Sequence, residues 1–145
     1  MLVTFDAQLR STLQSIHAKP SPAEARAIVE VARLAAAADN KTDLSEAVVL
    51  LALSRIVCEM AGLSQIPQIT AIDGARLAEI GEELVPTGAR ELAYAAAFLV
   101  MAQDLDVTKE ETQLARGLSE ALMIPPARAQ ELSAQMEQLV RSARG

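Results

Sequence analysis

The sequence predicts an all-α fold of about seven helices in a single domain covering residues 1–145. Hydrophobic residues make up 51% of the chain and charged residues 22%, a balance typical of a globular protein. Alanine and leucine dominate while aromatic residues make up only 2%, and small or straight-chain side chains lose little freedom in a helix. Apolar residues recur at helical spacing, and no stretch alternates convincingly with a period of two, so we expect no strands.

Periodicity and helix-breaking residues give the boundaries of the helices. The predicted helices span residues 5–18, 22–38, 44–61, 71–84, 89–103, 109–123 and 126–144. The first rests on the helical spacing of apolar residues such as Leu9 and Leu13. The second opens with Pro22 at its first position, inside a capping box that Ser21 and Glu24 would form.

The later helices are marked by polar breaks, glycine and proline. The third helix follows the polar residues 39–42 and stops at Gly62. The fourth carries its apolar residues on one side. The fifth contains the apolar run 92–102, which is about half as long as a membrane span and predicts a helix buried on all sides. Residues 125–126, both proline, separate the sixth helix from the seventh.

A repeat is the most informative feature of the chain. Residues 39–46 read DNKTDLSE, and residues 104–111, 65 positions later, read DLDVTKEE. In both, an apolar helix reaches an aspartate, a short acidic corner follows, and a new helix begins. Each corner also has capping-box spacing, because a short oxygen-bearing residue is followed by glutamate three positions later.

The repeat predicts two pseudo-symmetric helix–acidic loop–helix units, unit one over 22–64 and unit two over 88–125. One such pair of helices cannot bury its own apolar face, whereas two pairs packed face to face can. The second and fifth helices would then lie in the middle, and the rest would cover the flanks. This arrangement is a helical bundle or an orthogonal array.

Residues 95–126, AAAFLVMAQDLDVTKEETQLARGLSEALMIPP, resemble the repeated motif of tellurite-resistance TerB-like proteins. In that motif an apolar helix is followed by Asp-Gly, a Ser or Thr cap, a Glu, and a helix with a Gly-Leu-Ser-like stop. Asp104, Thr108 and Glu111 have the expected spacing. The first unit looks like the same motif with a second helix about one turn longer, and the resemblance covers residues 29–126.

The resemblance implies an all-α fold with internal pseudo-symmetry and a role as a stress-response or scaffolding module. The family is similar to an N-terminal domain of some membrane-anchored co-chaperones, and its acidic residues are proposed to bind divalent metal. This chain departs from the motif at Asn40 and Leu105, which occupy the two glycine positions. Lys41 also adds a positive charge to the first corner.

The acidic corners have two interpretations. Hard cations prefer clustered oxygen ligands, so the carboxylates could hold a divalent cation. The candidate ligands are Asp39, Asp43, Glu46, Asp104, Asp106 and Glu111. The other interpretation is helix capping beside a solvated loop, because the helix dipole favours carboxylates there without any cation. Neither corner has the twelve-residue frame and central glycine of an EF-hand.

Other reactive side chains have structural interpretations. His17 is expected near the end of the first helix, where the helix dipole or solvent would satisfy the polar groups of its imidazole. Cys58 lies in an apolar stretch and is expected to be a small core residue. The pairs 82–83 and 110–111, all glutamate, are expected on solvated faces. No phosphate-binding glycine loop and no nucleophile elbow occur in the sequence.

The seventh helix carries an apolar stripe that predicts a core face and leaves open a partner groove or a homodimer seam. The stripe consists of Leu132, Met136, Leu139 and Val140.

These features favour a non-enzymatic module that binds a protein partner, with any groove expected between the two units. The first alternative is a divalent-metal-binding protein, and the least favoured is an enzyme with a carboxylate site. The net charge of −6 argues against nucleic acid. With no signal peptide and no membrane span in the sequence, we expect a cytoplasmic protein. Peripheral membrane association and homodimerisation are left open.

Overall fold

The computed structural model describes residues 5–37, 44–66, 74–104 and 109–144, and within them it is all-helical. The predicted fold class is therefore confirmed. The described elements are α1 (Phe5–Ile16), α2 (Pro22–Ala37), α3 (Leu44–Met60), α4 (Gly74–Glu83), α5 (Thr87–Met101), the 3-10 turn η1 (Ala102–Asp104), α6 (Lys109–Ala121) and α7 (Pro126–Arg144).

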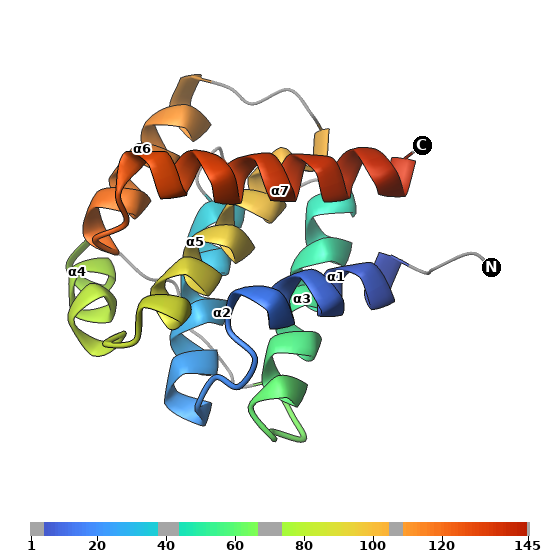
Figure 1. Cartoon of the computed structure of the whole chain (residues 1–145), viewed down its shortest axis with the longest axis horizontal. Coiled ribbons are helices and arrows are strands. Elements are labelled where there is room, and N and C mark those ends of the chain that lie inside the picture. The colour runs from blue at the N-terminus through green and yellow to red at the C-terminus, as the bar shows by residue number, and fades with distance from the viewer. Residues whose placement is uncertain (1–4, 38–43, 67–73, 105–108, 145) are drawn as a thin grey trace.

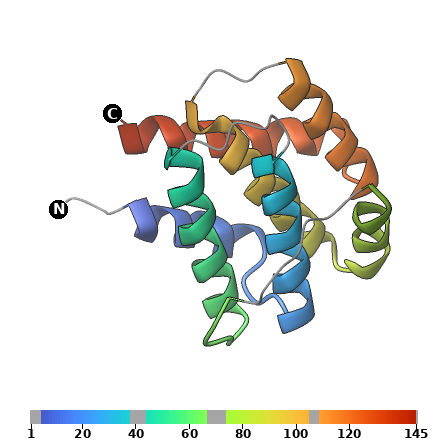
Figure 2. The same cartoon turned by 180° about the vertical axis from the view of Figure 1, so that it is seen from behind.

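The helices form crossed layers around α5 (Figures 1 and 2). Helices α1 and α7 lie beside each other across one face, and α2 and α3 run crosswise to them on the opposite face. Helices α4 and α6 lie together at one end of the molecule. This is the orthogonal type of array that the sequence leaves open, and every helix can turn one side toward the same core.

The central pair is α2 and α5, which pack more extensively against each other than any other two helices. Both carry many buried alanines, including Ala32 and Ala36 in α2 and Ala93 and Ala97 in α5. Because a methyl group adds little width, the two helix axes can approach closely and still exclude water. The predicted position of these two helices at the centre agrees with the structure.

Two predictions about the core are confirmed. Every residue from 92 to 102 is buried, so the longest apolar run is a helix covered on all sides. The stripe on α7 is also buried, with Leu132 and Met136 fully inaccessible to solvent. That stripe therefore belongs to the core.

Some helix boundaries differ from the predicted ones. Helix α1 ends at Ile16 instead of residue 18, and the His17 side chain that follows it contacts Glu24 of α2. Helix α5 begins at Thr87, two residues before the predicted start. Pro86 has an extended backbone, and its carbonyl accepts hydrogen bonds from the amides of Ala89 (3.1 Å) and Arg90 (3.2 Å).

The capping box at the start of α2 is confirmed. The Glu24 amide donates to Ser21 Oγ over 3.1 Å, and the Ser21 amide donates to Glu24 Oε1 over 3.0 Å. These reciprocal bonds satisfy two amides that the first turn of a helix leaves without partners.

Helices α3 and α6 end in the same way. Gly62 (φ 80°) follows α3, and the amide of the next residue donates to the carbonyl of Cys58 over 2.8 Å. Met123 (φ 58°) follows α6, and the amide of Ile124 donates to the carbonyl of Ser119 over 2.8 Å. Both patterns are Schellman motifs, so the predicted stop at Gly62 is confirmed.

The pseudo-symmetry of the two units stays a prediction, because the two corners, residues 38–43 and 105–108, lie outside the described residues. Among the helices that are described, none is long and apolar enough to cross a membrane.

Candidate functional site

The predicted metal ligands lie largely outside the described residues. The positions or the side chains that the structure leaves undescribed are Asp39, Asp43, Glu46, Asp104 and Asp106. The remaining candidate, Glu111, is described and lies in the first turn of α6. The described residues contain no group of three His, Cys, Asp or Glu side chains that could hold a metal ion. The metal hypothesis therefore stays a prediction about the two corners.

Glu111 does not lie on a solvated face, so that expectation was wrong. It is only 3% exposed. Its position explains the burial, because Ala115, Leu118 and Leu122 follow it at helical spacing and are buried too. The buried face of α6 therefore begins with a carboxylate. Because a charged residue is normally expected at the surface, the sequence alone does not predict that this position is buried.

His17 also differs from its expected surroundings. Its Nε2 lies 3.2 Å from Glu24 Oε1, and both side chains are largely covered. A Cβ added at Gly88 would lie only 2.7 Å from His17 Nδ1, so the ring packs closely against the start of α5. The imidazole therefore joins α1, α2 and α5 and is not left to the dipole or to solvent.

Cys58 is buried as expected, and it packs with Val29 in a second, small hydrophobic cluster. Burial raises the pKa of the Cys58 thiol above its usual value, because the core disfavours the thiolate. Since the thiolate is the nucleophile, this environment suits a packing role.

A buried carboxylate that the sequence analysis did not single out joins α2 to α4. Glu30 is 3% exposed and lies between two arginines. Its Oε2 accepts from Arg76 Nε over 2.6 Å, and its Oε1 accepts from Arg76 Nη2 and Arg26 Nε over 3.2 Å each. The carboxylates of Glu30 and Glu83 hold the pKa of Arg76 above its usual value. The paired charges attach α4 to the core, and a buried charge needs such partners.

The strongest candidate for a functional site is a groove of about 850 Å³ between α6 and α7, hereafter the α6/α7 groove. Its floor comes from α5. Tyr94 and Phe98 lie there with ring centroids 6.2 Å apart, and they are two of the chain's three aromatic residues. Ala115, Ile124 and Ala129 extend this apolar surface. The groove forms because α6 and α7 both pack on α5 while diverging from each other.

Polar groups surround this apolar floor. The hydroxyls of Tyr94 and Ser133 lie 2.8 Å apart and form a hydrogen bond that fixes the tyrosine ring. Arg116 and Glu120 line the α6 side, and Glu137 lines the α7 side. No ion pair within the described part of the chain involves these three side chains. Their charges are therefore free to meet a ligand.

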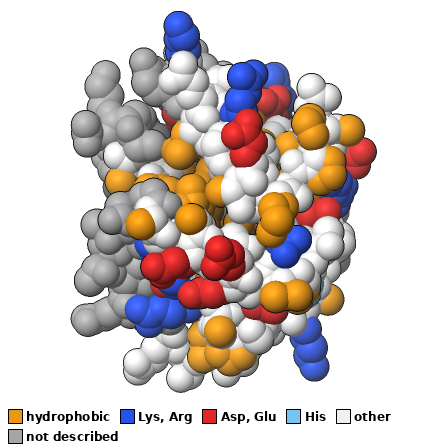
Figure 3. Space-filling view, turned by 90° about the vertical axis from the view of Figure 1, so that its left-hand side faces the viewer, with side chains coloured by type: hydrophobic (Ala, Val, Ile, Leu, Met, Phe, Trp, Pro, Cys, Tyr) orange, Lys and Arg blue, Asp and Glu red, His pale blue; other side chains and the backbone are white. Residues whose placement is uncertain are grey.

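Charge is mixed on the neighbouring surface. The end of the molecule where α4 and α6 lie shows acidic, basic and hydrophobic side chains interspersed (Figure 3). Recognition near this end would depend on shape and apolar contact more than on a field of one sign.

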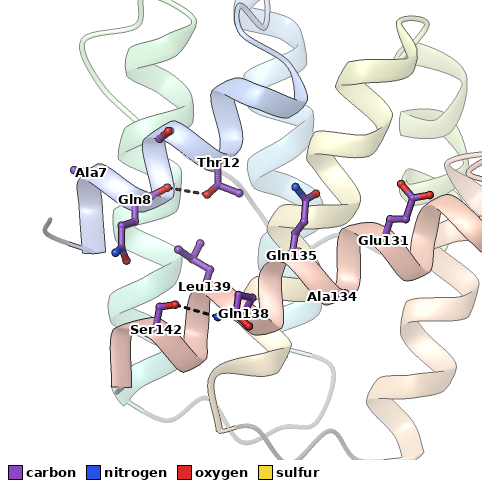
Figure 4. Close-up of a pocket in the computed structure, with 10 residues that line it drawn as sticks. Ala7, Gln8, Thr12, Glu131, Ala134, Gln135, Gln138, Leu139 and Ser142 are labelled. Atoms are coloured by element: carbon purple, nitrogen blue, oxygen red, sulfur yellow. Dashed lines mark hydrogen bonds between the residues drawn. The ribbon is translucent and has the colours of Figure 1, made fainter.

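A second groove, of about 750 Å³, lies on the other side of α7, between α7 and α1 (Figure 4). We call it the α1/α7 groove. Its walls carry small side chains, hydroxyls and amides. The lining residues are Ala7, Gln8, Ser11 and Thr12 from α1, and Glu131, Ala134, Gln135, Gln138, Leu139 and Ser142 from α7. Glu131, the only charged residue in the described part of this lining, accepts from Arg128 Nη1 over 2.9 Å.

Sequence reasoning did not predict the α6/α7 groove, and it named a partner groove along the seventh helix only as an alternative. The expected groove lay between the two units, whereas these two border α7, which belongs to neither unit. Tyr94 and Phe98 were interpreted as core residues, which they are, since both are buried. Comparison of the chain with protein-family models, curated proteins and solved structures gives no match.

Proposed function

We propose that the chain is a non-enzymatic module that binds a protein partner in the α6/α7 groove, in a stress-response or scaffolding role similar to that of TerB-like proteins. The observation that carries the proposal is the aromatic floor, Tyr94 and Phe98, set between two diverging helices. Binding sites usually combine an apolar surface with a few placed polar groups. Tyrosine is also enriched among the residues that dominate binding energy.

The rim favours a polypeptide as the ligand. Arg116 and Glu120 on one side and Glu137 on the other present both signs of charge around an apolar floor. An amphipathic segment fits this arrangement, because its apolar side chains would cover the rings while its charges meet the rim. Interfaces of this type take most of their affinity from a buried apolar centre and their specificity from the polar edge.

The test is a selection of random peptides of about 16 residues, long enough to span about 24 Å as a helix. The peptides are displayed on phage and selected on the purified full chain. Selected peptides are then synthesised, and their affinity is measured by fluorescence anisotropy. We expect binders that carry large apolar residues.

Two variants decide whether the peptides occupy the α6/α7 groove. Ser133→Arg places a long side chain over its floor and should weaken binding by at least about tenfold. Ser15→Arg is the matched control, because Ser15 is exposed on α1 and lines neither groove; affinity should stay within about twofold. Recovery of no binder, or equal affinity of both variants, would overturn the proposal.

A further inference from the structure

Helix α4 lies at the edge of the molecule, packed against α2 and α6 (Figures 1 and 2). With ten residues it is the shortest α-helix in the described part of the chain. Helices of this length are marginal in isolation, so α4 depends on its packing. It contacts the core through Leu77, Ile80 and, just after its end, Leu84, which share one face. Amphipathic helices that bind in a groove of another protein use the same spacing.

The ion pairs between α2 and α4 leave each helix with a charge partner of its own. Glu30 of α2, which is 3% exposed, accepts from Arg76 of α4 through both carboxylate oxygens. Within α2, Arg26 Nε also donates to Glu30 over 3.2 Å. Within α4, Arg76 Nη1 donates to Glu83 over 2.8 Å. Separation of the helices therefore leaves neither charge without a partner. A permanent contact would be at least as stable with an apolar pair, whereas charged groups are hydrated when the two surfaces part.

The contact of α4 with α6 requires a small residue. A Cβ added at Gly81 would lie only 2.3 Å from the backbone oxygen of Ala121, which cannot move aside as a flexible side chain can. The surface under α4 thus specifies what can occupy it. Glu30 requires a cation. Counted from that cation, α4 has apolar residues one, four and eight positions later and glycine five positions later.

We propose that the surface of α2 and α6 around Glu30 and Ala121, hereafter the α4-binding surface, also binds an amphipathic helix of a partner protein, which displaces α4. The partner helix carries an arginine, apolar residues and a glycine at the same spacing as α4. Helix α4 is the competitor within the chain and covers this surface until the partner binds. The site is distinct from the α6/α7 groove, whose lining comes from α5, α6, α7 and the turn between the last two helices.

The probe is a fluorescein-labelled synthetic peptide with the sequence of residues 74–85, added to the full chain. The unmodified chain should bind it weakly, because tethered α4 competes at a high effective concentration. Gly81→Ala weakens the docking of α4 and leaves the α4-binding surface unchanged, so the peptide should bind at least about tenfold more tightly, measured by fluorescence anisotropy. Gly117→Ala is the matched control, because its new Cβ meets no atom within 4 Å, and affinity should stay within about twofold. Equal affinity of the two variants would overturn the inference.

A second pair of changes tests the recognition of arginine by Glu30. A peptide carrying Arg76→Gln should bind the Gly81→Ala chain at least about tenfold more weakly than the unchanged peptide. Adding Glu30→Gln to that chain should reduce the difference between the two peptides to about twofold, whereas a purely structural role of Glu30 would weaken both peptides alike. Urea unfolding of each variant verifies that the fold is retained.

Amide hydrogen exchange of the unmodified chain tests the inference even if Gly81→Ala does not fold. The amides of residues 78–84 should exchange at least about tenfold faster than those in the middle of α5, because α4 opens locally. Excess unlabelled peptide should accelerate their exchange further, since it occupies the surface that α4 leaves. If the α4 amides exchange as slowly as those of α5, or do not respond to the peptide, the inference is overturned.

Ser133→Arg separates this inference from the proposed function. It obstructs the α6/α7 groove and should leave affinity for the 74–85 peptide within about twofold. A loss of about tenfold would place the peptide in that groove and overturn the inference. If the 74–85 peptide fails to bind while the selected peptides still respond to Ser133→Arg, the inference fails and the proposed function stands.

Discussion

Helices α3 and α6 each follow one of the predicted acidic corners, and they differ in composition, length and the residue that closes them. Helix α3 has 17 residues, of which three are charged, and Gly62 closes it. Helix α6 has 13 residues, of which five are charged. It carries Gly117 in its interior, and the residue with positive φ that follows it is Met123 instead of a glycine. The glycine that would suit its C-terminus lies in its middle.

This difference shows that α6 depends on tertiary packing more than α3 does. Glycine weakens a helix interior, and a non-glycine residue at positive φ is strained. Helix α6 offsets these costs through one buried face, formed by Ala115, Leu118 and Leu122. Because α6 is also one wall of the α6/α7 groove, the wall with the weaker local preferences borders the proposed site. Binding regions often come from the less stable parts of a fold.

The largest effect should come from truncating two buried leucines, Leu53 in α3 and Leu118 in α6, which lie 65 positions apart as the two corners do. Both are fully buried. Leu53→Ala and Leu118→Ala should each lower the free energy of unfolding by about 2 to 5 kcal/mol, because each removes buried methyl groups and leaves a cavity. Urea unfolding measures both. A loss below about 1 kcal/mol in either would show that the helix is not anchored through that leucine.

Substitutions at Gly62 and Met123, the residues with positive φ that follow α3 and α6, test how the two helices end. Gly62→Ala should cost about 1 kcal/mol, and the cost is purely conformational because the added Cβ would have no atom within 4 Å. Met123→Gly should raise stability by about 0.5 to 1 kcal/mol, since it relieves the strained backbone and removes a side chain that is 57% exposed. Both changes are measured by urea unfolding. If Met123→Gly were destabilising, the Met123 side chain would have a packing role that its exposure does not suggest.

Replacing the glycine in the middle of α6 with alanine tests the same difference between α3 and α6. Gly117→Ala should raise stability by about 0.5 to 1 kcal/mol, because alanine favours a helix interior and the new Cβ has free space. Thermal unfolding measures the gain. Gly117 lies outside both grooves, so peptide affinity serves as the control and should not change. No gain in stability would mean that the chain needs glycine at this position.

The sequence predicts the helices well because the signals for them are local. Apolar spacing, a capping box and a closing glycine act within a few residues, and the structure confirms the capping box and the stop at Gly62. The run 92–102 also correctly predicts a helix buried on all sides. Boundaries were less accurate where the cap was unusual, as at Pro86, which starts α5 without a side-chain hydrogen bond.

The candidate site was not predictable in the same way. A groove arises where α6 and α7 diverge above α5. Helical periodicity contains no information about the distance between two helices. Tyr94 and Phe98 have the same local pattern as any core residue. Buried charges were missed for a related reason, because Glu30 is stabilised by Arg76, 46 residues away in the chain. Only packing shows that such residues meet.

The smallest expected effect concerns the outer face of α3, which is apolar but exposed. Leu51 is 63% exposed and Val48 is 57% exposed. Leu51→Gln should change the free energy of unfolding by less than about 0.5 kcal/mol, because the side chain loses little contact. Urea unfolding compares it with Leu53→Ala on the same helix. A loss of about 2 kcal/mol or more would mean that Leu51 is covered in solution.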